Sequence, residues 1–281
     1  MVKLGFSLEN QYALPMAQVL DLLVKVGFSA VSVSWKRGSS LAQTILMAKE
    51  RGLMVQSIHG PIRTVANLWS HDKAIAQPAL QDFLDAASDC ARFGIPTLVV
   101  HTWYGKNYTF CKEDLCFDSF DTLIAHAERL GVAIAFEHLE GPEYFAELMD
   151  RFQAHPTVGF CWDSGHECCY NPGWDFLRHY GHRLNMTHLN DNMGLSDPTG
   201  RLVTTDDVHL IPGDGIIDWT AAMADLKASR RQEILNLELK IRPHGDQCTL
   251  DLYSQLPLED FLRRAYQSAC RIVGDYFDEQ P

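Results

Sequence analysis

The sequence contains no long apolar run. A membrane-spanning helix needs about 18 or more consecutive apolar residues, and no stretch of this chain reaches that length. The N-terminal segment MVKLGFSLEN also lacks an apolar core followed by a small-residue cleavage site, so we do not expect a secretion signal. These two absences favour a cytoplasmic protein without a membrane span.

Paired cysteines are missing as well. The eight cysteines are scattered along 281 residues, and none of them forms a CxxC pair. Disulfide-stapled scaffolds are much shorter chains, and they pair their cysteines at regular spacings. We therefore expect reduced thiols, as in a cytoplasm, most of which fill the core.

Positive charge is scarce. The chain has 24 lysines and arginines against 36 acidic residues, which gives a net charge of −12. A polyanionic partner would have to bind against this overall repulsion. The basic residues are dispersed along the sequence, and the densest pairs, Arg230–Arg231 and Arg263–Arg264, lie in expected helices. The composition therefore disfavours nucleic acid as a partner.

No low-complexity linker and no shift in composition divides the chain. Instead, short β-rich apolar runs alternate with segments of helical periodicity. The strand-like runs are residues 4–8, 30–35, 54–60, 96–103, 132–139, 158–165, 183–191 and 233–240. The helical patterns are residues 15–26, 40–51, 74–93, 119–130, 143–154, 173–181, 218–229 and 257–277.

Eight βα units in one uninterrupted chain predict a closed barrel. Gly27, Gly52, Gly94 and Gly131 each follow a helical pattern, where a left-handed C-cap favours glycine. A (β/α)8 barrel typically needs about 250 residues, close to the length of this chain. We therefore predict an α/β protein whose residues 1–281 form a single (β/α)8 barrel domain. A doubly wound open sheet is the alternative.

Polar residues collect where the predicted strands end, which is the rim that carries the chemistry of such barrels. A lone histidine at a strand end is more often a structural residue than a ligand. Here, however, all strands from the third to the eighth deliver a histidine or a carboxylate to the same rim. These residues are His59, His101, Glu137, Asp163, His166, His188 and Glu238. Strand 8 also carries Lys240, and the long connection after strand 7 adds Asp207 and His209.

Three of the rim residues are carboxylates that need a compensating positive charge. Glu137, Asp163 and Glu238 cannot all be ionised and crowded together without one. Carboxylates combined with imidazoles are the ligand set that suits a divalent transition metal such as zinc or manganese. The sequence therefore predicts a metal site at the mouth of the barrel.

The segment CWDSGHECC, residues 161–169, carries part of this site. We expect Asp163 to end its strand with its side chain over the barrel mouth. Ser164 and Gly165 would then turn the chain, so that His166 points to the same centre. Glu167 is expected to face solvent or to cap the next helix.

These residues occur in motifs that resemble the xylose-isomerase-like TIM-barrel superfamily. That superfamily holds sugar and sugar-phosphate isomerases and epimerases, inosose dehydratase-like enzymes and the endonuclease IV group. The resemblance covers essentially the whole chain. Its most specific pieces are SIHGP (57–61), VVHTW (99–103), FEHLEG (136–141), WDSGH (162–166), THLNDN (187–192), HLIPGDGIIDW (209–219) and LELK (237–240).

The resemblance implies two alternative sets of metal ligands. The epimerase branch implies one divalent metal, Mn²⁺ or Zn²⁺, held by Glu137, Asp163, His188 and Glu238, with His166 and His209 near the substrate. The endonuclease branch uses three zinc ions, and its further ligands would be His59, His101, His166, Asp207 and His209. That branch carries a basic residue where this chain has Val208, and the acidic balance of the chain departs from it further.

The epimerase branch implies proton abstraction next to a carbonyl, in which Glu137 and Glu238 flank the sugar. One glutamate takes the proton, and the other returns a proton to the opposite face or to the adjacent carbon. His59, His101, His166 and His209 are candidates for contacts with substrate oxygens. Lys240 would meet a substrate oxygen or phosphate, or pair with a ligand carboxylate. The candidates for an apolar wall beside the sugar are Trp35, Trp103 and Phe6.

The segment from 192 to 217 is unusually long for a loop without secondary structure, and such loops are usually functional. We expect it to act as a lid that is hinged near Gly194 and Gly213–Gly215 and brings His209 over the site.

Four functions remain open at this point. A metal-dependent isomerase or epimerase of sugars or sugar phosphates is favoured. An inosose-type dehydratase, a multi-zinc phosphodiester hydrolase and a non-catalytic sugar- or metal-binding relative are the alternatives. Association into a homo-oligomer through the outer helices is a further expectation.

Overall fold

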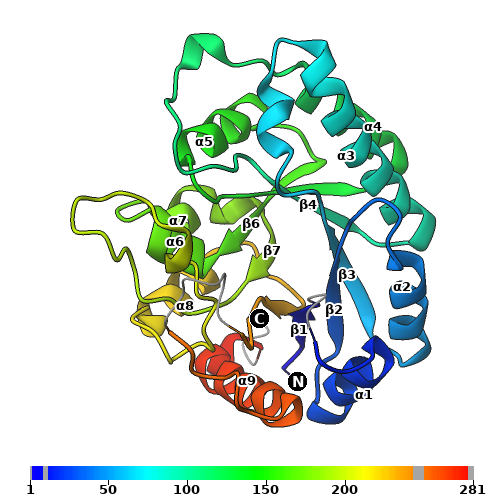
Figure 1. Cartoon of the computed structure of the whole chain (residues 1–281), viewed down its shortest axis with the longest axis vertical. Helices are drawn as coiled ribbons and strands as arrows, with labels where there is room; N and C mark the ends of the chain where they lie inside the picture. Colours follow the sequence, from blue (N-terminus) through cyan, green and yellow to red (C-terminus); the bar gives the residue numbers. More distant parts are fainter. Residues whose placement is uncertain (1, 9–11, 243–249, 278–281) are drawn as a thin grey trace.

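A computed structural model describes residues 2–8, 12–242 and 250–277. Eight parallel strands form one sheet in the order β7-β6-β5-β4-β3-β2-β1-β8, and they lie at the centre of the molecule in Figure 1. Backbone hydrogen bonds from Leu189 to Asn236 and from Glu238 to Leu189 join the two ends of the sheet. The strands are Leu4–Ser7, Ala30–Ser34, Met54–His59, Thr97–His101, Ala133–Glu137, Val158–Asp163, Leu184–His188 and Leu235–Leu237.

Helices cover the outside of this barrel (Figure 1). The α-helices of the described residues are α1 Met16–Val26, α2 Leu41–Glu50, α3 Lys73–Phe93, α4 Asp118–Leu130, α5 Pro142–Arg151, α6 Ser164–Tyr170, α7 Phe176–Tyr180, α8 Trp219–Ala228 and α9 Leu258–Val273. Short 3₁₀ helices span Val65–Trp69, Lys112–Asp114, Gly181–Arg183, Thr204–Asp206 and Gly274–Phe277. The predicted (β/α)8 barrel is confirmed.

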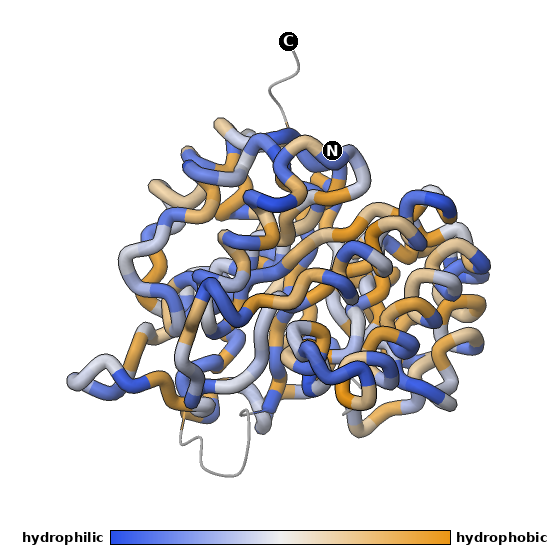
Figure 2. The backbone as a smooth tube through the Cα atoms, turned by 90° about the horizontal axis from the view of Figure 1, so that it is seen from above, coloured by the Kyte–Doolittle hydropathy of each residue, from blue (hydrophilic) through white to orange (hydrophobic). Residues whose placement is uncertain are grey.

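The helices pack on the barrel through one apolar face each, and Figure 2 shows the resulting alternation of hydrophilic and hydrophobic segments along the chain. In α9 the buried residues include Phe261, Leu262, Ala265 and Ala269, which recur at helical spacing. No helix in the described part of the chain is both long and apolar enough to cross a membrane.

Glycine ends three of the long helices as predicted. Gly27, Gly94 and Gly131 are the C-caps of α1, α3 and α4, and all three have left-handed backbone angles. Arg51 is the C-cap of α2, and Gly52 follows it with a positive φ of 75°. These caps turn the chain from each helix into the next strand. Of the eight cysteines, Cys248 lies outside the described residues, and the other seven are free.

The interior of the barrel explains why polar side chains reach its mouth. A small apolar cluster inside the barrel consists of Val99, Ala135, Cys161 and Met186. Side chains two residues apart on a strand point to the same face. The inward residues that follow this cluster along β4, β5, β6 and β7 are therefore His101, Glu137, Asp163 and His188.

The last strand is shorter than predicted. We expected it to span residues 233–240, but β8 ends at Leu237. Glu238 and Lys240 consequently belong to the loop that follows β8 rather than to the strand itself. Both side chains still line the cavity at the barrel mouth.

Candidate metal centre

Four side chains from neighbouring strand ends converge at the mouth of the barrel. Glu137 ends β5, Asp163 ends β6, His188 ends β7 and Glu238 follows β8. Each offers one ligand atom, and these four atoms all lie within 4.8 Å of one another. Three carboxylates and one imidazole so close together form a donor set that suits a divalent transition metal.

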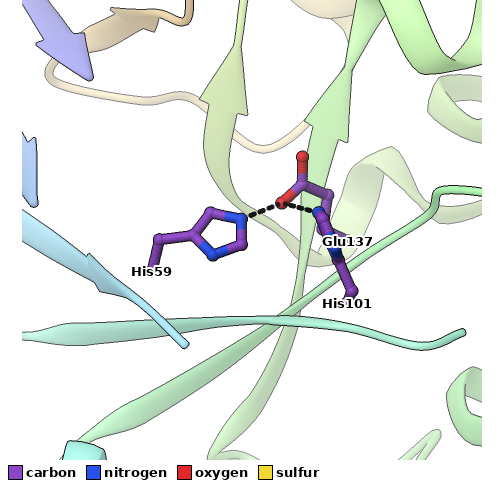
Figure 3. A group of neighbouring side chains, drawn as sticks. All are labelled: His59, His101 and Glu137. Carbon is purple, nitrogen blue, oxygen red and sulfur yellow. Dashed lines mark hydrogen bonds and ion pairs between the residues drawn. The ribbon is translucent and has the colours of Figure 1, made fainter. Parts of the chain in front are cut away.

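Glu137 lies at the centre of this arrangement and is completely buried. Its Oε2 atom is 3.1 Å from Nε2 of His59 and 3.2 Å from Nε2 of His101, as Figure 3 shows. Its Oε1 atom is 2.9 Å from Nδ1 of His188. Burial disfavours the charged carboxylate, but His188 and His101 outweigh that effect and hold the pKa of Glu137 well below its usual range.

His188 is clamped between two carboxylates. Its Nδ1 atom lies 2.9 Å from Glu137 Oε1 and also 2.9 Å from Glu238 Oε2. Burial alone lowers the pKa of a histidine, yet Cys161 and these two glutamates raise the pKa of His188 well above its ordinary value. A positive charge beside these two carboxylates is therefore strongly favoured. A proton on His188 supplies that charge here, and a bound metal ion would supply it as well.

Asp163 is held in place by amide donors. Its Oδ1 atom accepts hydrogen bonds from the backbone N–H of His166 at 2.8 Å and from Nδ2 of Asn190 at 3.0 Å. Burial, together with the nearby Glu137 and Glu238, raises the pKa of Asp163 above its usual value. A further positive charge beside this carboxylate would relieve the repulsion.

The segment after Asp163 differs from our expectation. We expected Ser164 and Gly165 to form a turn, but they begin helix α6, and Asp163 is its N-cap. A carboxylate at an N-cap accepts the N–H of the third helical residue, which here is His166. A Cβ atom on Gly165 would lie 1.8 Å from Oδ1 of Asn190. Glycine therefore allows Asn190 to approach the metal centre.

Two further groups of possible ligands flank the first. His59, His101 and Glu137 form one group, and the other contains His166, Asp207 and His209. Nδ1 of His101 and Oδ1 of Asp207 are buried without a hydrogen-bond partner among the described residues. Buried polar atoms of this kind normally have a partner. The donor sets of all three groups therefore fit bound metal ions.

His209 is strained, which is common at functional sites. Its φ angle of +49° lies in the left-handed region and is the only positive one among the described non-glycine residues. Its Nδ1 lies 3.0 Å from the carbonyl oxygen of Glu238, and its Nε2 lies 3.0 Å from Oδ2 of Asp207. The long segment after β7 thereby holds the His209 ring beside Asp207 and Glu238.

A cavity of about 450 Å³ opens above these groups. Among the residues predicted to bind substrate, those that line it are His59, His101, His166, His209 and Lys240. Glu238 and Asp207 line it too, whereas Glu137, Asp163 and His188 lie beneath it.

The predicted aromatic wall is not at this cavity. Trp35 lies between α2 and α3, where its indole N–H donates to Asp89 at 2.9 Å. Phe6 is buried against Phe28, and Trp103 stacks on Tyr144 with ring centroids 4.2 Å apart. Phe6 and Trp35 each lie next to a residue that lines the cavity, Ser7 or Ser34, so the period of two turns their rings outward. Trp103 lies in the loop after β4, beyond the strand period, where it packs on α5.

The structure instead supplies a different wall that the sequence did not reveal. Ile62, Tyr104, Leu139 and Tyr170 line the cavity from the loops after β3, β4 and β5 and from the end of α6. Their positions depend on the paths of these loops. A strand pattern carries no information about those paths.

Glu167 does not face solvent, although one of our expectations was that it would. Its Oε2 atom accepts a hydrogen bond from the indole of Trp162 at 2.8 Å. The N-cap of the next helix, α7, is Asp175, whose side chain accepts a hydrogen bond from the backbone N–H of Arg178. Burial raises the pKa of the Glu167 carboxyl group to about 7.

With this fold and this site described, the family is clear. Residues 20–256 match the model of the xylose isomerase-like TIM barrel family, and the chain belongs to that family. It is 29% identical over 269 residues to the uncharacterised protein y4fM of Sinorhizobium fredii, with 82% of this chain and 83% of the relative covered. It is 26% identical over 208 residues to the inosose isomerase of Bacillus licheniformis, with 70% of each chain covered.

Solved structures show the same fold. The IolI protein with a bound zinc atom superimposes with a TM-score of 0.77 at 20% identity and covers 99% of this chain and 100% of its own. D-Psicose 3-epimerase from Clostridium cellulolyticum with D-tagatose superimposes with a TM-score of 0.74 at 15% identity, covering 97% and 99%.

Proposed function

We propose that this protein is a divalent-metal-dependent isomerase or epimerase of a sugar or sugar phosphate. The observation that carries the proposal is the convergence of Glu137, Asp163, His188 and Glu238 within 4.8 Å beneath a cavity of about 450 Å³. The relatives support it, because they include a protein named inosose isomerase and a fold neighbour named D-psicose 3-epimerase.

A bound Zn²⁺ or Mn²⁺ would supply Lewis-acid stabilisation of negative charge on a substrate oxygen. The residues of the chain move the proton. Glu238 takes a proton from the carbon next to the carbonyl, and the C–H electron pair moves into the enediolate. Glu137, which must carry a proton in the substrate complex, then returns that proton either to the opposite face of that carbon or to its neighbour. Glu238 passes the proton that it took to water in the cavity, and Glu137 is reprotonated before the next turnover.

The two glutamates differ in exposure, and this difference determines which of them takes the proton and which returns one. The Glu238 side chain is 22% exposed, whereas that of Glu137 is 0% exposed. A substrate in the cavity therefore reaches Glu238 first. His166, His209 and Lys240 also line the cavity and are proposed to bind and orient its hydroxyl oxygens.

Dehydration of an inosose-type cyclitol would use the same metal site and the same proton abstraction. It differs in the fate of the substrate. A hydroxyl group of the substrate takes up a proton and leaves as water, and a new double bond remains. Loss of water is observed by mass spectrometry, so incubation with a cyclitol ketone separates the two reactions. A non-catalytic relative would bind the sugar without exchanging any C–H proton.

A multi-metal phosphodiester hydrolase is the second candidate. It is favoured by one observation, the presence of the groups His59–His101–Glu137 and His166–Asp207–His209 beside the first group. Val208 opposes it, since this residue is buried and apolar where a basic side chain would be needed to face a nucleic acid.

Metal content separates these candidates. Protein purified without chelators should contain about one Zn²⁺ or Mn²⁺ per chain by elemental analysis if it is an isomerase. Asp163→Asn should lower this content, because the variant loses a negative charge from the four-ligand group. Asp207→Asn should not lower it. Three equivalents in the wild-type protein, with one lost in Asp207→Asn, would instead favour the hydrolase.

The segment from 192 to 217 is proposed as a lid over the site. Thr204, Asp207 and His209 line the cavity from within this segment, and Gly194 and Gly213 have positive φ angles of 75° and 95° that suit hinges. Limited trypsin cleavage after Arg201 should therefore slow at least severalfold when substrate is bound. Equal cleavage rates with and without substrate would refute the lid.

A further inference from the structure

We propose that the cavity above the candidate metal centre binds a phosphate group of the substrate through four basic side chains. They are Arg63, Lys106, Lys240 and Arg242. The inference rests on the proposed function, because it narrows the substrate of that same site to a sugar monophosphate rather than a neutral sugar.

The first argument is the distribution of charge. The chain has 24 basic residues against 36 acidic ones, yet four of the basic residues line this one cavity. Arg63 comes from the loop after β3, Lys106 from the loop after β4, and Lys240 and Arg242 from the loop after β8. Three separate loops therefore bring positive charge to one small site in an acidic protein. Glu140, Asp207 and Glu238 line the same cavity, so the attraction for an anion depends mainly on the arginines at its rim.

The two lysines are fixed in the cavity wall. Lys106 pairs with Glu140 and lies over the ring of Tyr170, with its Nζ atom 4.6 Å from the ring centroid. Lys240 Nζ lies 3.6 Å from Oδ2 of Asp207. Their side chains are only 18% and 17% exposed. Both ammonium groups are thereby held in place before an anion arrives, which reduces the entropy lost on binding.

Within the described residues the two arginines are not paired with carboxylates, unlike several other arginines of this chain. Arg37, Arg151 and Arg264 each pair with at least one aspartate. Arg63 and Arg242 are exposed and have no carboxylate partner among residues 2–8, 12–242 and 250–277. A guanidinium group can bind two phosphate oxygens at once. The exposed pair can therefore bind an anion at the rim, next to the two lysines.

The position and size of the cavity point to a phosphate monoester. In (β/α)8 barrels the loops after strands 7 and 8 frequently bind phosphate, and here the loop after β8 supplies Lys240 and Arg242. A volume of about 450 Å³ accommodates a small molecule. Carboxylate groups at the bottom of the cavity repel an anion, so the phosphate would bind at the basic rim with the sugar pointing toward Glu238.

Phosphate binding itself is the direct test. Inorganic phosphate is titrated calorimetrically into the zinc-loaded protein and into the double variant Arg63→Gln/Arg242→Gln. The control is Arg92→Gln/Arg271→Gln, which removes the same charge from the last turns of α3 and α9. The first variant should weaken phosphate binding about tenfold, and the control should leave it unchanged. Equal binding by both variants, or stronger binding of acetate than of phosphate, would overturn the inference.

A second measurement separates this inference from the proposed function. Ketoses and their monophosphates are supplied as matched pairs in heavy water, and deuterium incorporation is recorded. We expect incorporation at a KM about tenfold lower for the monophosphate, and Arg63→Gln/Arg242→Gln should raise that KM while kcat changes little. Preference for the neutral sugar would refute the phosphate site alone. If phosphate binding depends on Arg63 and Arg242 but none of the ketoses or ketose monophosphates incorporates deuterium, the proposed isomerase activity alone would be refuted.

Discussion

Replacing Glu238 with glutamine is expected to lower the rate of substrate proton exchange by about 10²–10⁴-fold, the usual contribution of a general acid or base. Glutamine keeps the size of the side chain but cannot accept the proton. Glu137→Gln should cause a similar loss, because this residue returns the proton and also contacts His188 at 2.9 Å. Deuterium incorporation from heavy water into the substrate measures both effects.

Two controls make this result specific. Glu143→Gln changes a glutamate of the neighbouring helix α5 that accepts a hydrogen bond from Tyr108 at 3.1 Å, and it should retain the wild-type rate. Metal content is measured in every variant, because the amide oxygen of glutamine is a weaker ligand than a carboxylate. Near-wild-type turnover in both Glu238→Gln and Glu137→Gln would refute the two-glutamate scheme.

Replacing Asp191 with alanine is expected to cost about 3–5 kcal/mol of unfolding free energy. Its completely buried carboxylate accepts four hydrogen bonds. The donors are the backbone N–H groups of Asn192, Gly213 and Ile217 and the indole of Trp219, at distances of 2.8, 2.7, 3.1 and 2.8 Å. Alanine would leave all four donors without this acceptor, and two of them, the Asn192 N–H and the Trp219 indole, are buried.

This carboxylate also ties together both ends of the proposed lid. A Cβ atom on Gly215 would lie 2.3 Å from Oδ1 of Asp191, so glycine is needed where the chain passes it. Urea denaturation of Asp191→Ala measures the loss of stability. Asp197→Ala, in the exposed part of the same segment, should cost less than about 1 kcal/mol. If both variants were equally stable, Asp191 would not hold the segment.

Much of the fold could be predicted from local patterns. The alternation of apolar runs with helical periodicity located all eight strands, because a strand buried on both faces needs a continuous apolar run. Glycine marked the ends of α1, α3 and α4, since few other residues adopt a left-handed cap without strain. The pattern did not reveal α6, because only seven residues form it and several of them serve the site.

The convergence of the four candidate ligands was also predictable, for a physical reason. Glu137, Asp163 and His188 end buried strands, and the period of two sends them inward above an apolar cluster. Trp35 follows β2 by one residue and was predicted on the same side as the cavity. Its indole instead reaches Asp89 on α3. Ser34, the last residue of β2, lines the cavity, and side chains one residue apart along a strand point to opposite faces of the sheet.

The sequence by itself therefore determined the barrel and the polar ends of its strands, since both follow from periodicity within short segments. Only the tertiary structure decided which loop residues meet above those ends. Arg63, Lys106 and Arg242 are dispersed along the chain, and nothing in the local pattern relates them to one another. Closure of the ring through Leu189 and Asn236 places the loop after β8 beside the rest of the rim, so residues far apart in sequence share one cavity.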